Sequence, residues 1–266
     1  MLRAANTSKY VVGSYNLDSL DVLGDLARRA ASARLPLIFQ FGPWSTGRLS
    51  IEQIGRSARA LLHDAPGVFL HLDHSHDLEF IRAALDAGFD SVMFDGSGIP
   101  LDENIDRTQQ VVKLCRAHDA AAEGAVGQLE HGVDTSVEDA RRFVSKTGVD
   151  ALSVAIGTAH GKPRTPGQID LIRLDALSTL GVPLVIHGGS GLPPEVTQAV
   201  RCTAVAKVNV ATACYRRYRQ RHAEAIEQGA RFDYPSALAH LAADAFWGII
   251  VERSRLYGCL REDSLG

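Results

Sequence analysis

Three histidines that are far apart in the chain could together bind one metal ion. His74 lies in HLDHSHD (residues 71–77), His160 in AIGTAHG and His187 in PLVIHGG. A catalytic zinc ion takes three protein ligands, often neutral imidazole nitrogens, and keeps its fourth position for water or substrate. Each histidine taken alone could equally be a buried or surface residue with an ordinary hydrogen bond. Taken together, the three predict a zinc site if the fold brings them to one place.

Two aspartates lie where they could assist such an ion. Asp73 directly precedes His74, and Asp95 ends the apolar run in MFDG. A neighbouring dication lowers the pKa of a carboxyl group, so proton transfer by Asp73 would require burial or hydrogen bonding. Asp95 has an alternative role, which is to cap the turn that follows it. Asp73 is therefore the candidate acid or base, and Asp95 is a candidate partner of a metal ligand.

Two turns rich in glycine and hydroxyl groups predict a phosphate site. HGGSG covers residues 187–191, and NVAT covers residues 209–212. Glycines let backbone N–H groups come close to an anion, and the N-terminus of a following helix adds further donors. The candidate phosphate ligands are Gly188, Gly189, Ser190, Asn209 and Thr212.

These residues lie at the ends of eight short apolar runs, and the chain between the runs has helical periodicity. Alternating strands and helices indicate parallel strands joined by crossover helices, and eight repeats favour a closed (β/α)8 TIM barrel over an open sheet. The three histidines follow the third, sixth and seventh runs, and barrel active sites lie at the carboxyl ends of the strands. We therefore expect them to converge. The runs are YVVGSYN, LPLIFQF, GVFLHLD, DSVMFDG, AAAEGAV, VDALSVAI, VPLVIHGG and VAKVNVAT.

One helix is expected beyond those of the barrel. Residues 236–258 have an amphipathic pattern that places Leu238, Phe246 and Ile250 on one apolar face. Packing on the barrel or contact with another subunit would cover that face. Because no linker or change of composition divides the chain, we expect one domain over residues 1–266.

The composition is typical of a soluble globular protein. The chain has 28 Lys and Arg and 31 Asp and Glu, which gives a formal net charge of -3, so a nucleic-acid partner is not expected. No run approaches the roughly 20 apolar residues of a membrane helix, and the first residues lack the apolar core of a secretory signal. A cytoplasmic location and no membrane partner are expected. The four cysteines show no C-x-x-C spacing and are expected to be reduced thiols.

The motifs resemble those of the class II, zinc-dependent ketose-bisphosphate aldolases, the family of the fructose- and tagatose-1,6-bisphosphate aldolases. GSYN, LHLDH, MFDGS, AIGTAHG, PLVIHGGSG and KVNVAT occur in the family's order and spacing, and the match runs from about residue 10 to residue 215. The resemblance implies a TIM barrel in which His74, His160 and His187 bind one zinc ion per subunit. It also implies an optional monovalent cation and a homodimer or homotetramer.

The same resemblance implies a reaction. Dihydroxyacetone phosphate would bind the metal through its carbonyl and hydroxyl oxygens, and its enediolate would attack an aldehyde; the reverse reaction would cleave a ketose phosphate. Asp73 would handle the proton at the aldehyde oxygen. The matching motifs add Asn16, Gly161 and Ala211 to the substrate-binding residues.

The segment after the fifth run departs from the family. The family has two glutamates here, followed by a long acidic loop that carries the base that removes the substrate proton. This chain has Glu123 at the first position, Ala125 at the second, and a shorter loop. Glu123 is therefore a candidate partner of a metal ligand. Glu130 is the nearest candidate for the base, and His131 is the next.

The segment FQFGPWSTG, residues 39–47, also departs from the family, because Trp44 adds bulk where substrate could lie. Two alternatives to the aldolase therefore stay open. One is a lyase or isomerase that uses the same scaffold with another proton path and another phosphosugar. The other is a non-catalytic sugar-phosphate binder, against which the presence of Asp73 argues. The candidate ligands of a distal phosphate are Lys162, Arg164, Arg216 and Arg217.

Overall fold

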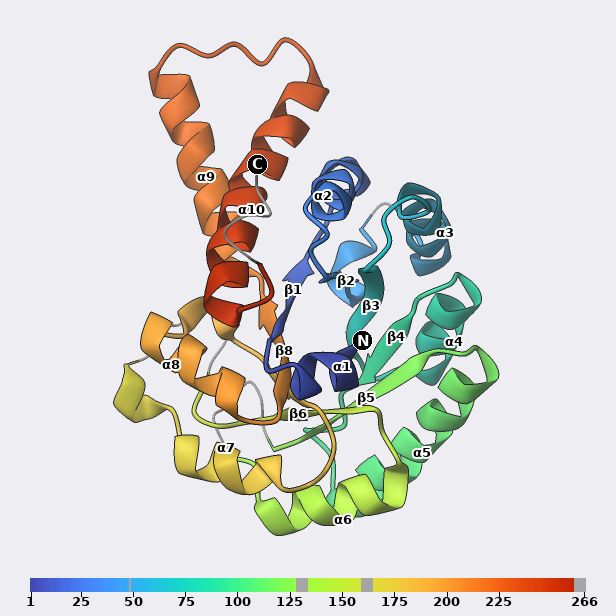
Figure 1. Ribbon diagram of the computed structural model, residues 1–266. Coiled ribbons are helices and arrows are strands. Elements are labelled where there is room, and N and C mark those ends of the chain that lie inside the picture. The colour runs from blue at the N-terminus through green and yellow to red at the C-terminus, as the bar shows by residue number, and fades with distance from the viewer. Residues whose placement is uncertain (48, 128–133, 159–164, 261–266) are drawn as a thin grey trace.

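Eight parallel strands close into a barrel in the computed structural model, which describes the chain except for residues 48, 128–133, 159–164 and 261–266. Each strand pairs with the next, and β8 pairs with β1 (Figure 1). The (β/α)8 prediction is confirmed, and all eight apolar runs form strands. The strands are β1 (Val12–Asn16), β2 (Leu37–Phe41), β3 (Val68–Ser75), β4 (Ser91–Phe94), β5 (Ala121–Val126), β6 (Ala151–Val154), β7 (Leu184–Ile186) and β8 (Val205–Val210).

Helices surround the barrel and alternate with its strands (Figure 1). Their limits follow local sequence signals, as α6 illustrates: the Ser136 hydroxyl accepts a hydrogen bond from the backbone N–H of Asp139, and Gly148 ends the helix in a left-handed conformation. The helices are α1 (Leu2–Thr7), α2 (Leu20–Ser32), α3 (Ile51–Leu61), α4 (Leu78–Asp86), α5 (Leu101–Ala117), α6 (Val137–Thr147), α7 (Leu171–Ser178), α8 (Pro194–Ala199), α9 (Thr212–Glu227) and α10 (Pro235–Tyr257).

The expected additional helix is α10, which forms a hairpin with α9. The outer part of this hairpin projects beyond the barrel, as Figure 1 shows. The remainder of α10 packs against α2, α8 and β1, so its apolar face is largely covered by this chain itself. In that segment, Phe246 and Ile250 are buried, as their positions in the amphipathic pattern predict.

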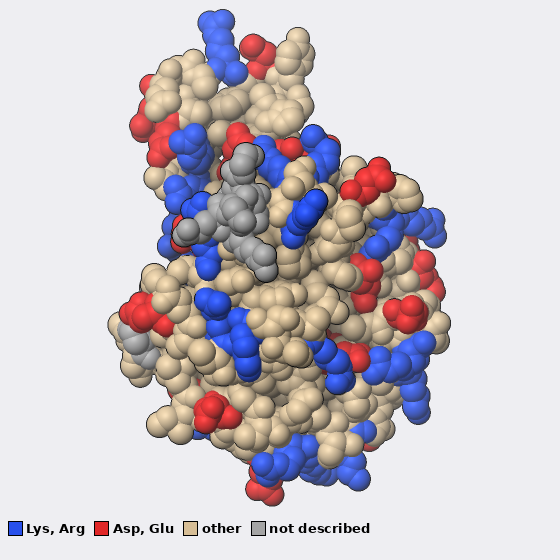
Figure 2. Space-filling view, viewed as in Figure 1, with Lys and Arg blue, Asp and Glu red and all other residues tan. Residues whose placement is uncertain are grey.

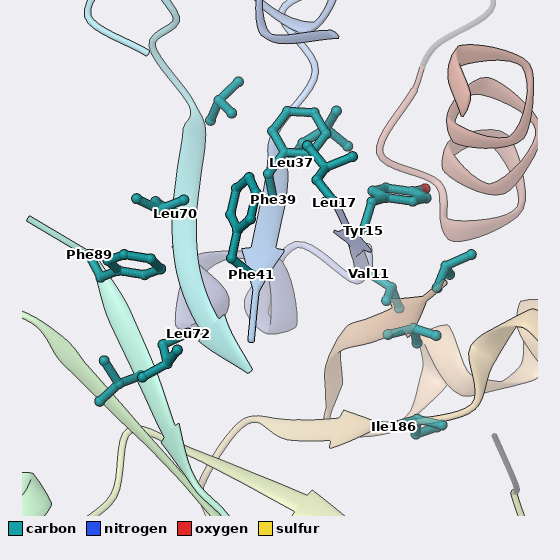
Figure 3. Close-up of a cluster of buried hydrophobic side chains, with 14 of the residues drawn as sticks. Val11, Tyr15, Leu17, Leu37, Phe39, Phe41, Leu70, Leu72, Phe89 and Ile186 are labelled. Atoms are coloured by element: carbon teal, nitrogen blue, oxygen red, sulfur yellow. The ribbon is translucent and has the colours of Figure 1, made fainter. Parts of the chain in front are cut away.

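The main hydrophobic core lies between the strands and the helices rather than inside the barrel. Phe39 and Phe41 of β2 and Leu70 and Leu72 of β3 belong to this layer (Figure 3). Side chains alternate along a strand, so the residues between them face the barrel axis. These inward residues include polar and charged side chains, which supply the site described below.

The two ends of the barrel interior differ. At the amino ends of the strands, Ala5 of α1 packs with Val12, Ile38 and Ala206. A cavity of about 380 Å³ also opens at this end, and Lys207 and Glu123 are among its lining residues. Water at this end can therefore come close to charged groups inside the barrel.

Charged side chains of both signs are interspersed on the face shown in Figure 2. This distribution gives no extended basic stripe on that face, as expected from the formal net charge of -3. None of the described helices combines the length and the apolar character needed to span a bilayer.

Gly148 and Gly248 form a matched pair for testing the role of glycine in this fold. Gly148 has φ of +67°, whereas Gly248 lies on an exposed face within α10, and an added Cβ would meet no atom within 4 Å at either position. We expect Gly148→Ala to lower the free energy of unfolding by about 1–2 kcal/mol, because a left-handed conformation strains alanine. Gly248→Ala should raise it by about 0.5–1 kcal/mol. Urea unfolding measures both, and equal effects of the two changes would contradict this assignment.

Candidate metal and phosphate site

The end of β3 breaks the alternation of side chains and so places two consecutive residues in one site. His74 has φ of +44°, a conformation that costs a non-glycine residue about 1–2 kcal/mol. The pairing of β3 with β4 shifts between Leu72 and Ser75. In a regular strand, Asp73 and His74 would point to opposite faces. The irregular backbone lets both side chains reach the carboxyl end of the barrel interior.

Asp73, His74 and His187 form the candidate metal cluster. Each offers a ligand atom, and these atoms lie within 4.8 Å of one another. The imidazole rings of His74 and His187 meet edge to face, with centroids 4.6 Å apart, and His74 Nε2 lies 3.9 Å from Asp73 Oδ1. The structure thus brings together three of the residues predicted from β3 and β7.

Asp95 fixes the orientation of His74. Its Oδ2 atom lies 2.6 Å from His74 Nδ1, which directs Nε2 towards Asp73. Burial alone would lower the pKa of His74, but the negative charges of Asp73 and Asp95 outweigh it and raise the pKa to about 9. Asp95 also accepts a hydrogen bond from the backbone N–H of Ser97. Asp95 thus contacts both the turn that follows it and the imidazole of the candidate ligand His74.

His187 has a corresponding carboxylate neighbour in Glu123 of β5. His187 Nε2 lies 3.0 Å from Ser153 Oγ and 3.4 Å from Glu123 Oε1, and the Ser153 hydroxyl donates to the same carboxylate at 2.7 Å. Burial lowers the pKa of His187, which keeps the ring neutral. Metal-binding histidines commonly have a carboxylate or another acceptor at the second ring nitrogen. Asp95 and Glu123 supply this arrangement for both histidines.

Glu123 belongs to a charged layer inside the barrel. Lys207 Nζ of β8 donates to Glu123 Oε2 at 2.7 Å and to His71 Nε2 at 3.0 Å, and His71 Nδ1 lies 2.8 Å from Ser91 Oγ. Burial would raise the pKa of Glu123, but Lys207, together with the neighbouring His187 and His71, outweighs burial and holds this pKa well below its usual range. Burial and the charge of Lys207 lower the pKa of His71 to about 3, so this imidazole is neutral.

Side-chain amides from three strands surround the Asp73 carboxylate. Asn16 of β1 donates to Oδ2 at 3.0 Å, Gln40 of β2 donates to Oδ2 at 2.8 Å, and Asn209 of β8 donates to Oδ1 at 3.2 Å. Burial would raise the pKa of Asp73, but the neighbouring His74 and other cationic groups outweigh burial and lower this pKa. Asp73 is therefore an ionised, oriented acceptor. The amide oxygen of Asn209 has no partner among the described residues and can accept a hydrogen bond from a ligand.

The turns after β7 and β8 form the candidate anion site. An added Cβ at Gly189 would lie 2.2 Å from Val208 Cγ1 and 2.7 Å from the Asn209 carbonyl oxygen, so only glycine allows the two turns to approach this closely. The Ser190 hydroxyl oxygen accepts the backbone N–H groups of Ala211 and Ala213, which leaves its O–H for a ligand. Helix α9 begins at Thr212, directly after β8. The N-terminus of a helix favours a bound anion.

A cavity of about 640 Å³ connects the candidate metal cluster with these turns. Its volume is within the usual range for small-molecule sites. The described lining residues come from the ends of β1, β2, β3, β7 and β8. They are Asn16, Asp18, Pro43, Trp44, Asp73, His74, His76, Gly188, Ser190, Asn209, Ala211, Thr212 and Tyr215.

Some predicted site residues lie outside the described part of the chain, namely Glu130, His131, His160, Gly161, Lys162 and Arg164. Conversely, the motifs did not identify three residues of the network: Gln40, Ser153 and Lys207. The two-residue periodicity of a strand could have identified Lys207, because it precedes Asn209 by two positions and therefore shares its face of β8. Gln40 and Ser153 are likewise single polar residues within apolar runs.

The barrel and this cavity define the class of protein, a (β/α)8 enzyme that combines candidate metal ligands with an anion-binding turn. Residues 1–261 match the family described as fructose-bisphosphate aldolase class-II. The chain belongs to this family, and it is therefore an aldolase, a lyase of carbon–carbon bonds. The resemblance inferred from the motifs is confirmed.

Individual proteins give the same result. The 6-phospho-5-dehydro-2-deoxy-D-gluconate aldolase of Shouchella clausii is 37% identical over 227 residues, which cover 80% of this chain and 78% of the relative. The fructose-bisphosphate aldolase of Giardia intestinalis is 34% identical over 215 residues, covering 75% and 67% of the two chains. The crystal structure of the YdjI aldolase from Escherichia coli K12 has a TM-score of 0.86 and 25% identity, and the match covers 97% of this chain and 95% of that chain.

The Lys207–Glu123 pair predicts strong coupling between two substitutions. Lys207→Met should lower the free energy of unfolding of the metal-free protein by about 3–5 kcal/mol, because it leaves the Glu123 carboxylate buried and unpaired. Adding Glu123→Gln removes that charge, so the double variant should be more stable than additivity predicts, by up to about 3 kcal/mol. Urea unfolding of the four proteins of this cycle measures the coupling, and simple additivity would contradict the ion pair.

Proposed function

We propose that the protein is a zinc-dependent aldolase that forms and cleaves the bond between dihydroxyacetone phosphate, reacting as its enediolate, and an aldehyde. The observation that carries this proposal is the position of Asp73, His74 and His187 within one cluster beside the anion-binding turn. Relatives named for 6-phospho-5-dehydro-2-deoxy-D-gluconate and for fructose bisphosphate support a phosphorylated sugar as substrate. The phosphate would lie at the turns after β7 and β8.

The residues present fit a zinc ion. Imidazole nitrogen is a preferred zinc ligand, and carboxylates that orient imidazoles are a common feature of zinc sites. His74 with Asp95, and His187 with Glu123, provide two such pairs. His160 would be the third histidine ligand by its motif, and it lies outside the described residues. When bound, zinc supplies a Lewis acid that draws electrons from the substrate carbonyl, so that a neighbouring carbon can lose a proton near neutral pH.

Asp73 is assigned the proton of the hydroxyl next to the bond that breaks. In the cleavage direction this hydroxyl becomes an aldehyde and releases its proton, while the bonding electrons remain on the dihydroxyacetone phosphate fragment. An ionised carboxylate suits the acceptor role, and the amides of Asn16, Gln40 and Asn209 hold it in place. In the synthesis direction the same proton returns to the product hydroxyl. We assign the proton at the substrate carbon to Glu130, on the basis of its place in the sequence.

A cleavage assay with a panel of ketose mono- and bisphosphates, run with and without a chelator, tests the proposed function. We expect turnover that chelation abolishes and zinc restores. Cleavage of no panel member, with phosphosugar binding retained, would favour the non-catalytic binder. Isomerised rather than cleaved products would favour the isomerase.

The Asp73→Asn variant separates the two roles that Asp73 could have in the cluster. If Asp73 transfers a proton, the variant should retain one zinc ion per subunit and turn over about 100 to 10,000 times more slowly. Elemental analysis and steady-state kinetics provide the two measurements. Loss of zinc from the variant would instead identify Asp73 as a metal ligand.

Zinc affinity should depend on pH because His74 must lose a proton to bind the ion. The pKa of His74 is raised to about 9 without metal, so the ring is protonated at neutral pH and zinc must displace that proton. The association constant should therefore rise about tenfold per pH unit towards pH 9 and then level off. Calorimetry in buffers of different ionisation enthalpy measures the released proton.

The Asp95→Asn variant provides the control for this pH dependence. It removes a carboxylate that raises the pKa of His74. The zinc association constant should therefore stop rising at a lower pH than in the unaltered protein. Zinc affinity should also fall about 10–100-fold, because the ring loses its orienting partner. Zinc binding with no proton release at pH 7.5 in the unaltered protein would refute this assignment.

A further inference from the structure

One side of the catalytic cavity is built by residues that follow β1 and β2. Asp18, Pro43 and Trp44 line it there, whereas the anion-binding turns follow β7 and β8. A substrate with its phosphate at those turns and its carbonyl at the metal cluster must direct its remaining carbons to another part of the cavity. The ring of Trp44 lies beside the cluster, with its centroid 6.4 Å from that of His74. Trp44 is thus within reach of the distal carbons.

The backbone around Trp44 is anchored, so the indole occupies a built position. The Ser45 hydroxyl donates to the Leu17 carbonyl at 3.2 Å, and the Ser45 N–H donates to the Gly42 carbonyl at 2.8 Å. An added Cβ at Gly42 would lie 2.2 Å from the indole Cη2 atom. Gly42 therefore leaves the space in which the ring lies against the backbone. Even so, Trp44 is 51% exposed, an unusual fraction for an anchored indole.

The charges on this side do not suit a second phosphate. Asp18 contributes an exposed carboxylate, and none of the described residues that line the cavity is a lysine or arginine. Arg216 and Arg217, both candidate ligands of a distal phosphate, are exposed on α9 and do not line the cavity. Lys162 and Arg164 lie outside the described residues. A dianion placed between the Asp18 carboxylate and the Trp44 indole would be repelled and would lose hydration without gaining a cationic partner from the described lining of the cavity.

We propose that Trp44 and Asp18 select ketose 1-phosphates with an uncharged distal end over ketose bisphosphates. The indole face covers the C–H groups of the distal carbons, and the Asp18 carboxylate accepts a hydrogen bond from a distal hydroxyl. The Asp18 carboxylate repels the distal phosphate of a competing bisphosphate. Specificity then comes from an unfavourable contact with the wrong substrate. This inference rests on the proposed function and narrows its substrate class.

The synthesis reaction tests the inference without depending on the stereochemistry of any one ketose. With dihydroxyacetone phosphate fixed, kcat/KM is compared for glyceraldehyde and for glyceraldehyde 3-phosphate as acceptors, since the ratio of these constants measures specificity. We expect glyceraldehyde to be preferred at least about tenfold. A preference for glyceraldehyde 3-phosphate, or equal constants, would overturn the inference.

Variants identify the residues responsible. Trp44→Ala should lower kcat/KM for glyceraldehyde about tenfold, mainly through KM, while Trp44→Phe should retain most activity because it keeps an aromatic face. Asp18→Asn should raise kcat/KM for glyceraldehyde 3-phosphate because the repulsion is removed, and lower that for glyceraldehyde because a neutral amide oxygen accepts a weaker hydrogen bond than a carboxylate. Equal losses with both acceptors in Trp44→Ala, or no gain with the phosphorylated acceptor in Asp18→Asn, would refute the assigned roles.

A binding measurement keeps this test separate from the proposed function. The chain has two tryptophans, so in a Trp247→Phe background the emission reports on Trp44. Titration should show tighter binding of fructose 1-phosphate than of fructose 1,6-bisphosphate, with a change in emission that dihydroxyacetone phosphate alone does not produce. If the protein shows no turnover but binds fructose 1-phosphate more tightly than fructose 1,6-bisphosphate, only the proposed function is refuted. The reverse ranking would refute the inference even in an active aldolase.

Discussion

The site depends on one buried negative charge, the carboxylate of Asp73. A charge inside a protein is costly unless donors and opposite charges surround it, and this one receives amide hydrogen bonds from Asn16, Gln40 and Asn209 on three different strands. β1, β2 and β3 are neighbours in chain order, whereas β8 joins them only because it pairs with β1. Closure of the barrel therefore completes the solvation of Asp73, because it adds the amide of Asn209 to those of Asn16 and Gln40. The candidate metal cluster and the turns after β7 and β8 are arranged around this point.

A second constraint is the local backbone at His74. Its left-handed conformation costs free energy. This conformation allows the side chains of the adjacent Asp73 and His74 to point into one site. Ionic contacts on either side help to hold the arrangement, because His74 lies between the carboxylates of Asp73 and Asp95. The pattern is typical of functional sites, where local strain persists because the surrounding interactions fix it.

The strand order and the positions of the main site residues were predictable because both follow from periodicity. Apolar runs gave the eight strands, and residues at their carboxyl ends gave Asp73, His74, His187 and the glycine turns. Gln40, Ser153 and Lys207 were missed because a lone polar residue in an apolar run has no motif of its own; its meaning appears only when inward faces are compared across strands. Contacts such as Lys207 with Glu123 join residues 84 positions apart, and no local pattern encodes which inward side chains meet. The backbone irregularity at His74 was equally hidden, since the preferences of histidine do not require it.

The cavity at the amino end of the barrel has a consequence for hydration. Lys207 and Glu123 are among its lining residues, yet both are almost fully buried, so the ionic layer lies just beneath this cavity, at the end of the barrel opposite the candidate metal cluster. Exchange of the Lys207 ammonium protons with deuterium therefore needs a local opening that lets water reach the buried pair. Isotope exchange at the centre of the barrel should thus report on opening at the amino ends of the strands.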